Sequence, residues 1–377
     1  MSEKNIVISG VGIWTPTESV TNEELVEAYN GYVVKYNAEN AAEIEAGTVE
    51  AKPLSSAEFI TKASGIKSRY VYRKDGILDI NRMRPKWEER SDDEISHQAE
   101  VALIAARKAL AAANKKPEDV DAVIVSCAYT QRSYPAVAIE VQEQLGIKGF
   151  GFDMLVACSA ATFALQRAYE MVKAGTARCV IAINPELTSP QNNWRDRDSH
   201  FIFGDVATAT VVESDDTISP EAQHSYDVLS TKAQTVFSNN IRSNFGYTSY
   251  ADDTDPYGLD KFFIQNGRKV FKEVCPMAAE HISSQLESLH IEVADVKRWW
   301  LHQANINMNT LIGKRLLGRE ATAEEAPIVL DRYANTASAG SLIAFNLYHE
   351  DLQAGDTGVI CSFGAGYSIG SLVVRKR

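Results

Sequence analysis

Two stretches of this chain, residues 172–183 (VKAGTARCVIAI) and residues 352–363 (LQAGDTGVICSF), resemble each other and decide the fold. Each has the pattern of a helix that ends at Ala-Gly and is followed by a buried strand. Two further pairs occur in the same order: 118–128 with 294–304, and 203–213 with 363–374. Three matched pairs in one order predict an internally duplicated protein.

The regions around these pairs predict α/β architecture. Buried strands are expected at 5–12 and 120–128, and amphipathic helices at 95–113 and 270–289. A helix is also expected from Thr21, with a threonine cap and a glutamate at the third helical position. We divide the chain into an N-terminal half, 1–214, with an Ala/Glu-rich insertion at about 30–56, and a C-terminal half, 215–377.

Composition narrows the class of protein. With 377 residues, 45% of them hydrophobic, the chain can bury a large core. A net charge of −12 disfavours nucleic acid as a partner, and no apolar run approaches the roughly 18 residues of a membrane span. Five scattered cysteines without a CxxC pair suggest reduced thiols in the cytoplasm and no metal site.

The segment 154–165 (MLVACSAATFAL) places Cys158 where a strand is followed by a helix. The duplication sets Cys158 and Asn335 at equivalent positions, each at the start of a helix directed at a shared central site. A helix N-terminus favours a thiolate, and the small residues after Cys158 leave room for a substrate. The alternative is a buried packing cysteine. The residues that accompany Cys158 favour the nucleophile.

Two further polar residues are expected beside it. His302 ends the strand in WWLHQA, although a lone histidine is often structural; Asn335 lies in YANTASAG, where it could also cap a helix. A cysteine with two neutral donors suits carbon–carbon bond formation. The thiolate would take an acyl group from a thioester, and imidazole and amide would hold the enolate formed when a malonyl thioester loses CO2.

These segments resemble the β-ketoacyl-[acyl-carrier-protein] synthase III family of the thiolase superfamily over nearly the whole chain. The similarity is closest to a longer subgroup that includes β-ketodecanoyl synthases primed by octanoyl-CoA. It is carried by GVGIWTP, TNEEL, ASGIKSRYV, FDMLVACSAATFAL, NNWRDRDSHFIFGD, LHQAN, YANTASAG and SFGAGYSIGSLVV.

The resemblance implies an α-β-α-β-α layered fold with two mixed five-stranded sheets. It makes Cys158 the acylated nucleophile, and His302 with Asn335 the pair that promotes decarboxylative condensation. The oxyanion hole would be formed by the backbone N–H groups of Cys158 and Ala365. Family members usually have glycine where this chain has Ala365, so the loop could be shifted.

The same resemblance implies coenzyme A thioesters as substrates and no cofactor. Phe59 stands where many members stack tryptophan on adenine, Arg197 matches an arginine of the family, and Ala63 replaces a second one. Tyr134 would come from the partner of a homodimer and limit primer length. The residues expected to bind substrate or coenzyme A are Phe59, Tyr134, Arg197, Phe203, Asn305 and Phe363.

Acyl carrier protein, an acidic helical partner, is the second implied substrate carrier. Two basic groups could receive it: Arg268, Lys269 and Lys272 on one helix edge, and Lys314, Arg315 and Arg319 further on. An arginine that the family has shortly after HQAN is Asn307 here. The patch therefore need not follow the family in detail.

Several alternatives stay open on the sequence. An acetyl primer or a polyketide-type starter enzyme would use the same three residues. A thiolase would need Cys361 as a second catalytic cysteine, and a hydroxymethylglutaryl-CoA synthase would need a glutamate base. Three glutamates could be that base, but none of them lies in a motif that matches those synthases. They are Glu100, Glu140 and Glu186. A non-catalytic acyl-CoA-binding protein would not need the intact trio.

Overall fold

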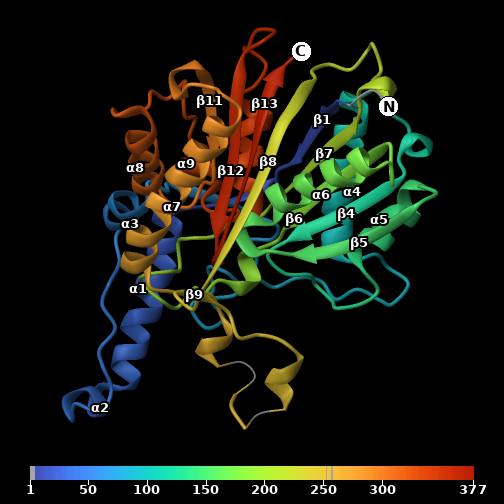
Figure 1. Ribbon diagram of the computed structural model, residues 1–377. Helices are drawn as coiled ribbons and strands as arrows, with labels where there is room; N and C mark the ends of the chain where they lie inside the picture. The colour runs from blue at the N-terminus through green and yellow to red at the C-terminus, as the bar shows by residue number, and fades with distance from the viewer. Residues whose placement is uncertain (1–4, 252, 256–257) are drawn as a thin grey trace.

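A computed structural model describes residues 5–251, 253–255 and 258–377 (Figure 1). Its main feature is a nine-stranded sheet in the order β11-β12-β13-β8-β1-β7-β6-β4-β5. The strands are β1 (Ile6–Trp14), β2 (Glu18–Thr21), β3 (Ser68–Val71), β4 (Ala122–Cys127), β5 (Phe150–Leu155), β6 (Cys179–Glu186), β7 (Val206–Ser214), β8 (Tyr226–Ser238), β9 (Ile241–Arg242), β10 (Ile264–Gln265), β11 (Val296–Leu301), β12 (Thr357–Gly364) and β13 (Gly366–Lys376).

The nine strands form two mixed groups, one from each half of the chain. Strands β1, β4, β5, β6 and β7 form the first, five-stranded group, as predicted. The second group, β8, β11, β12 and β13, has four strands rather than the predicted five. The groups are joined where β1 pairs with β8 through Val7–Asp227 and Ile8–Tyr226. These hydrogen bonds make the two strand groups one continuous sheet. The division of the chain into halves at 214/215 therefore stays a prediction.

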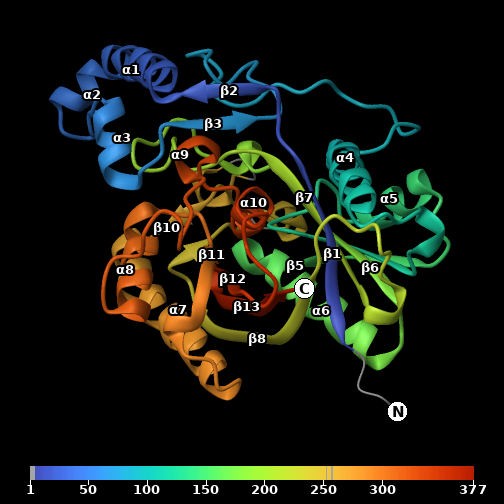
Figure 2. The same ribbon diagram turned by 90° about the horizontal axis from the view of Figure 1, so that it is seen from above.

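The helices cover both groups in layers (Figure 2). Helices α6 and α10 lie in the central layer, where one apolar cluster joins residues of both strand groups. Helices α4 and α5 cover the outer face of the first group, and α7 and α8 that of the second. The helices are α1 (Asn22–Glu39), α2 (Ala41–Glu45), α3 (Ala57–Ser64), α4 (His97–Ala112), α5 (Val137–Leu145), α6 (Ala160–Ala174), α7 (Gly267–Ser288), α8 (Ile306–Leu317), α9 (Leu330–Tyr333) and α10 (Gly340–Leu347).

The 30–56 insertion forms the projecting end of α1, then α2 and an extended return (Figure 1). The capping box expected at Thr21 is present, with Glu24 as its partner. The return segment is held to α1 by paired hydrogen bonds between Asn37 and Lys52 and between Asn30 and Ser55. The insertion is therefore an ordered part of the structure beside α3.

Two findings bear on the class of protein. Within the described ranges, no helix is both long and apolar enough to cross a membrane. All five cysteines are free thiols, four of them buried and Cys158 partly accessible.

Candidate active site

Cys158 lies in a tight turn between β5 and α6. Ala157 before it has a left-handed backbone, with φ of 45°, which costs a non-glycine residue roughly 1–3 kcal/mol. A 3-10 turn, Ala157–Ser159, then leads into α6. The backbone of Gly364 lies directly against this turn, because a Cβ added there would come within 2.5 Å of the Cys158 Cβ. Gly364 therefore leaves the space that the Cys158 side chain needs.

The thiol of Cys158 is protonated at rest. Burial, with a smaller contribution from the charge of Glu186, raises its pKa to about 12. The backbone N–H groups of Ala365 and of Cys158 itself lie at the sulfur and act in the opposite direction. The expectation of a resting thiolate is therefore wrong, because burial outweighs the two N–H groups. The proton must leave the sulfur when the acyl group arrives.

The same two N–H groups are those expected of the oxyanion hole. Ala365 lies in the connection from β12 to β13. Its N–H reaches the Cys158 sulfur even though this residue carries a side chain where the family usually has glycine. Donors fixed by the backbone in this way can stabilise a developing oxyanion.

His302 follows directly after β11. Its backbone N–H donates to the carbonyl of Cys361 at 2.8 Å, and its ring meets Phe363 edge-on, with 5.1 Å between ring centroids. Burial lowers the pKa of His302 to about 3, so the imidazole is neutral. Its Nδ1 is buried and has no hydrogen-bond partner within the described residues. A merely structural histidine would normally have that atom paired.

Asn335 lies in a strained turn between Ala334, with φ of 57°, and Ala337, with φ of 47°. Its backbone bonds both ways to the 202–204 segment, donating to Ile202 and accepting from Gly204. Its side-chain Oδ1 accepts from the N–H of Ala337 at 3.0 Å. Because Oδ1 is held by the backbone, the amide NH2 is the group left to donate elsewhere.

The three elements that carry these residues meet at one place. The turn Ala157–Ser159 contacts both β12 and the turn Ala337–Ala339 that precedes α10. On the other side, Gly340 lies against Gln303, the neighbour of His302, since a Cβ added there would come within 2.9 Å of the Gln303 Cβ. The fold thus brings the cysteine, histidine and asparagine segments together.

The structure corrects one equivalence between the halves. Cys158 and Ser338 each follow an alanine with a left-handed backbone, and each lies in a 3-10 turn that leads into a central helix. Ser338, not Asn335, is therefore the counterpart of Cys158. The sequence match aligns Asn335 with Cys158, but Asn335 precedes the turn Ala337–Ala339 that leads into α10.

The remaining predicted substrate residues fall into an inner and an outer group. Phe363 and Phe203 are buried near the trio, and Phe203 pairs by its backbone with Asn335. Phe59 lies in α3, where the guanidinium of Arg197 stacks 3.7 Å from its ring centre. Arg197 also donates to the Leu54 carbonyl of the insertion at 2.8 Å. An adenine ring could enter between Phe59 and Arg197 only by separating them.

Asn305 and Tyr134 belong to neither of these two groups. Asn305 caps α8, and its amide donates to the Ala63 carbonyl at 2.9 Å, so it links α8 to α3. Tyr134 lies before α5 and is 76% exposed.

The two basic groups lie on neighbouring helices. Arg268, Lys269 and Lys272 are exposed in the first turns of α7, and Lys314 and Arg315 are exposed near the end of α8. The two helices contact each other. Arg319 instead forms a two-pronged ion pair with Glu325.

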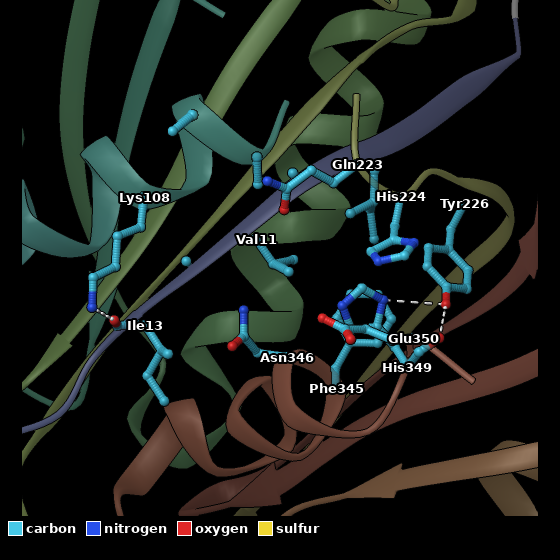
Figure 3. Close-up of a pocket in the computed structure, with 15 residues that line it drawn as sticks. Val11, Ile13, Lys108, Gln223, His224, Tyr226, Phe345, Asn346, His349 and Glu350 are labelled. Atoms are coloured by element: carbon cyan, nitrogen blue, oxygen red, sulfur yellow. Dashed lines mark hydrogen bonds between the residues drawn. The ribbon is translucent and has the colours of Figure 1, made fainter. Parts of the chain in front are cut away.

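A pocket of about 320 Å³ lies elsewhere, at the far end of α10 (Figure 3). It is lined by β1, α4 and the segment after α10, including His224, Tyr226 and His349, and by none of the predicted catalytic residues. No group of three or more acidic, cysteine or histidine side chains that could hold a metal occurs in the part of the chain that the structure describes.

Sequence reasoning missed the position of Glu186. This carboxylate ends β6, is fully buried and accepts from the backbone N–H groups of Ala128 at 3.0 Å and Ser338 at 3.1 Å. Burial raises the pKa of Glu186 to about 7. The sequence offered one signal, a glutamate at the end of a largely apolar strand, but no motif to interpret it.

A duplicated, layered fold with a cysteine at the start of a central helix is the arrangement expected of a condensing acyltransferase of the thiolase type. Family models agree: 3-oxoacyl-[acyl-carrier-protein (ACP)] synthase III matches residues 152–235, and its C-terminal model matches residues 286–376. The chain is 54% identical over 351 residues to a β-ketodecanoyl-[acyl-carrier-protein] synthase of Pseudomonas aeruginosa, covering 93% of this chain and 100% of that one. It belongs to the 3-oxoacyl-[acyl-carrier-protein] synthase III family and is a condensing enzyme of fatty acid biosynthesis.

Solved structures show the same fold. The synthase III of Pseudomonas aeruginosa superposes with a TM-score of 0.75 at 20% identity, covering 98% of both chains. The priming β-ketosynthase of the R1128 polyketide pathway superposes with a TM-score of 0.77 at 22% identity, covering 100% of this chain and 97% of that one. At these identities the likeness concerns the fold alone.

Proposed function

We propose that the enzyme loads a medium-chain acyl-CoA, such as octanoyl-CoA, on Cys158 and condenses it with malonyl-[acyl-carrier-protein]. The observation that carries the primer length is the 54% identity, over the full length of the relative, to a β-ketodecanoyl synthase. That relative's name gives a ten-carbon product, which an eight-carbon primer and the two carbons retained from malonyl would form. A cytoplasmic setting, where thiols stay reduced, suits a free Cys158.

In the first half-reaction the Cys158 sulfur attacks the thioester carbonyl. A new carbon–sulfur bond to Cys158 forms, the bond to coenzyme A breaks, and the Cys158 proton goes to the leaving thiolate. The N–H groups of Cys158 and Ala365 stabilise the tetrahedral oxyanion. Because both donors belong to the backbone, they need no side-chain movement to act.

In the second half-reaction malonyl loses CO2, and the electrons of the broken carbon–carbon bond form an enolate. His302 and Asn335 donate to the enolate oxygen, for which a neutral imidazole and an amide NH2 are suited. The enolate carbon attacks the acyl carbonyl on Cys158, the carbon–sulfur bond breaks, and the thiolate takes up a proton. Acyl-CoA, malonyl carrier protein and one proton thus give β-ketoacyl carrier protein, coenzyme A and CO2.

Initial rates with acetyl-, butyryl-, octanoyl- and decanoyl-CoA test the primer. The octanoyl thioester should give the highest kcat/KM, and intact-mass measurement should show the octanoyl mass on the enzyme but not on Cys158→Ala. A clear preference for acetyl-CoA would overturn the medium-chain proposal and leave an acetyl-primed synthase. A high rate with a polyketide carrier protein in place of the fatty acid one would favour the starter-enzyme alternative.

The enzyme is also proposed to be a homodimer joined along β5. This strand is an edge strand of the sheet, and its side chains Phe150 and Leu155 are 42% and 55% exposed. An edge strand with exposed apolar side chains can pair with another copy of the chain. Pairing two copies there would also bring Tyr134 of one chain toward the other. Light scattering should give twice the 41.5 kDa chain mass, and Phe150→Asp with Leu155→Asp should give the single-chain mass. A monomeric wild-type enzyme would contradict the proposal.

Carrier protein is proposed to bind the exposed basic residues of α7 and α8. Charge reversal of Arg268 and Lys272 should raise KM for malonyl carrier protein about tenfold and leave KM for octanoyl-CoA unchanged. Arg319→Glu is a matched control, since Arg319 is already paired with Glu325. If Arg319→Glu raised KM for malonyl carrier protein as much as charge reversal of Arg268 and Lys272 did, this binding site would be contradicted.

A further inference from the structure

The counterpart of the Cys158 site in the other half of the molecule is occupied by Glu186. Extending the match of 172–183 with 352–363 sets Glu186 opposite Gly366, and Ser338 is the counterpart of Cys158. At Cys158, the backbone of 364–366 supplies space and an N–H group. At Ser338, the Glu186 carboxylate lies against the turn and accepts from the Ser338 N–H and hydroxyl. The two turns are alike, but Cys158 is partly accessible, whereas Ser338 is fully buried.

Glu186 is fully satisfied by donors from two elements. One oxygen accepts from the Ser338 hydroxyl and N–H, and the other accepts from the N–H of Ala128, just after β4. The carboxylate thus joins the end of the first-half sheet to the start of α10. A buried carboxylate held by three donors is a rigid connection, because losing any of them would leave a buried polar atom unpaired.

This connection lies at one end of the turn that carries Asn335. Ala334 and Ala337 both have a left-handed backbone, a strained arrangement that persists only when its surroundings hold it. The 202–204 segment holds the turn at Asn335 itself, and Glu186 holds it at Ser338. Between these two points the N–H of Ala337 fixes the Asn335 side chain through its Oδ1. The direction of the Asn335 amide therefore depends on the position of Ser338.

We propose that Glu186 is a positioning residue for Asn335, acting through Ser338, and that it supports malonyl decarboxylation but not acyl transfer to Cys158. The inference rests on the proposed roles of Cys158 and Asn335. Acyl transfer is not slowed, because the donors at the Cys158 sulfur come from residues 158 and 365, to which Glu186 does not bond. The charge of Glu186 also raises the pKa of Cys158, so losing that charge would make the thiol proton easier to remove. A purely structural role would instead weaken both half-reactions together.

The test measures the two half-reactions separately in Glu186→Ala, Glu186→Gln and Ser338→Ala. Acyl transfer is followed as the rate of octanoyl mass gain from octanoyl-CoA, and decarboxylation as CO2 release from malonyl carrier protein. Glu186→Ala should lower CO2 release about 100-fold, which is the effect of displacing a catalytic group, here the Asn335 amide, by roughly 1 Å. Acyl transfer should stay within about threefold of wild type. Glu186→Gln, which can still accept from one N–H, and Ser338→Ala should each lose less, about tenfold.

Glu213→Gln is the matched control. Glu213 is also fully buried and accepts from a serine, Ser9, but it is paired with Lys115 as well and lies at the far end of β7. It should change both half-reactions alike. If Glu186→Ala or Ser338→Ala behaved like this control, or left CO2 release unchanged, the inference would be overturned.

Two reference variants separate this inference from the proposed function. Cys158→Ala should gain no octanoyl mass, and Asn335→Ala should acylate but release little CO2. If either reference failed, the assignment of the trio itself would fall. If both held and the Glu186 variants did not, only the role of Glu186 would fall. Should Glu186→Ala not fold, Ser338→Ala decides, since it removes a hydroxyl and keeps the backbone N–H.

Discussion

The turns at Cys158 and Ser338 have the same backbone and different neighbours. Both follow an alanine in the left-handed region, with φ of 45° and 47°, and both start a central helix. The first meets backbone N–H groups near Gly364 and Ala365; the second meets the carboxylate of Glu186. The difference shows how a duplicated fold can retain one reactive turn and convert the other into a support.

Exchanging the two side chains should have the largest effect. Cys158→Ser should lower acyl transfer from octanoyl-CoA at least about 1,000-fold, because a hydroxyl without an activating base is a far weaker nucleophile. Adding Ser338→Cys should not restore it, since Glu186 occupies the space and the donors that an acyl oxygen would need. Intact mass and peptide mapping measure both. An octanoyl group mapped to position 338 would show that the two turns are interchangeable.

The strand ends beside the two turns provide the next comparison. His302 and Ser126 are matched by the duplication, but the Ser126 hydroxyl donates to the Ala160 carbonyl at 2.8 Å, whereas His302 Nδ1 is unpaired among the described residues. His302→Ala should lower CO2 release about 100-fold or more and spare acyl transfer. Ser126→Ala should stay within about threefold in both.

The His302 effect should not depend on pH in the neutral range. Because burial lowers the pKa of His302 to about 3, the imidazole stays neutral from pH 5 to pH 8. The ratio of wild-type to His302→Ala CO2 release should therefore be constant over that interval. A ratio that changes tenfold with a midpoint near pH 6.5 would mean that the imidazole titrates as in water.

The sequence predicted the features that arise from repeated patterns. The matched segments predicted the duplication, the central helices and the strands that lead to Cys158 and His302, because burial and helix periodicity are visible in residue order. They could not locate the left-handed turn at Ala337, since alanine gives no signal for that conformation. The sequence match is therefore displaced: it aligns Asn335 with Cys158, whereas the structure aligns Ser338 with Cys158.

Contacts between distant segments were the other part that could not be predicted. The bond between Arg197 and the Leu54 carbonyl, and that between Asn305 and Ala63, depend on how the insertion and α8 pack beside α3. The role of Glu186 depends on α10 starting beside the end of β6. The resting thiol of Cys158 was likewise missed, because a helix start is visible in the sequence and the depth of burial is not.

The support at Ser338 can titrate, whereas the backbone at Cys158 cannot, so the two turns should differ in pH dependence. Burial raises the pKa of Glu186 from 4.5 to about 7, so between these values the folded protein keeps a proton that the unfolded chain has lost. This contribution to stability is present below pH 4.5 and is lost as pH rises through 7. The unfolding free energy of wild type relative to Glu186→Gln should fall by about 2 kcal/mol from pH 5 to pH 8. Urea denaturation at pH 5, 6, 7 and 8 measures it, and a rise with pH would contradict the raised pKa.

The smallest expected effect concerns the likeness of the two turns. Ala157→Gly and Ala337→Gly each remove a side chain from a left-handed backbone, which relieves strain of about 1 kcal/mol, and each adds flexibility to the unfolded chain that costs roughly as much. Both variants should therefore unfold within about 1 kcal/mol of wild type and of each other. Thermal and urea denaturation measure the unfolding free energies of the two variants. If the conformational strain is the same in both turns, their shifts agree; a loss above about 2 kcal/mol at one position alone would show that its methyl group, and not its backbone, is what the fold requires there.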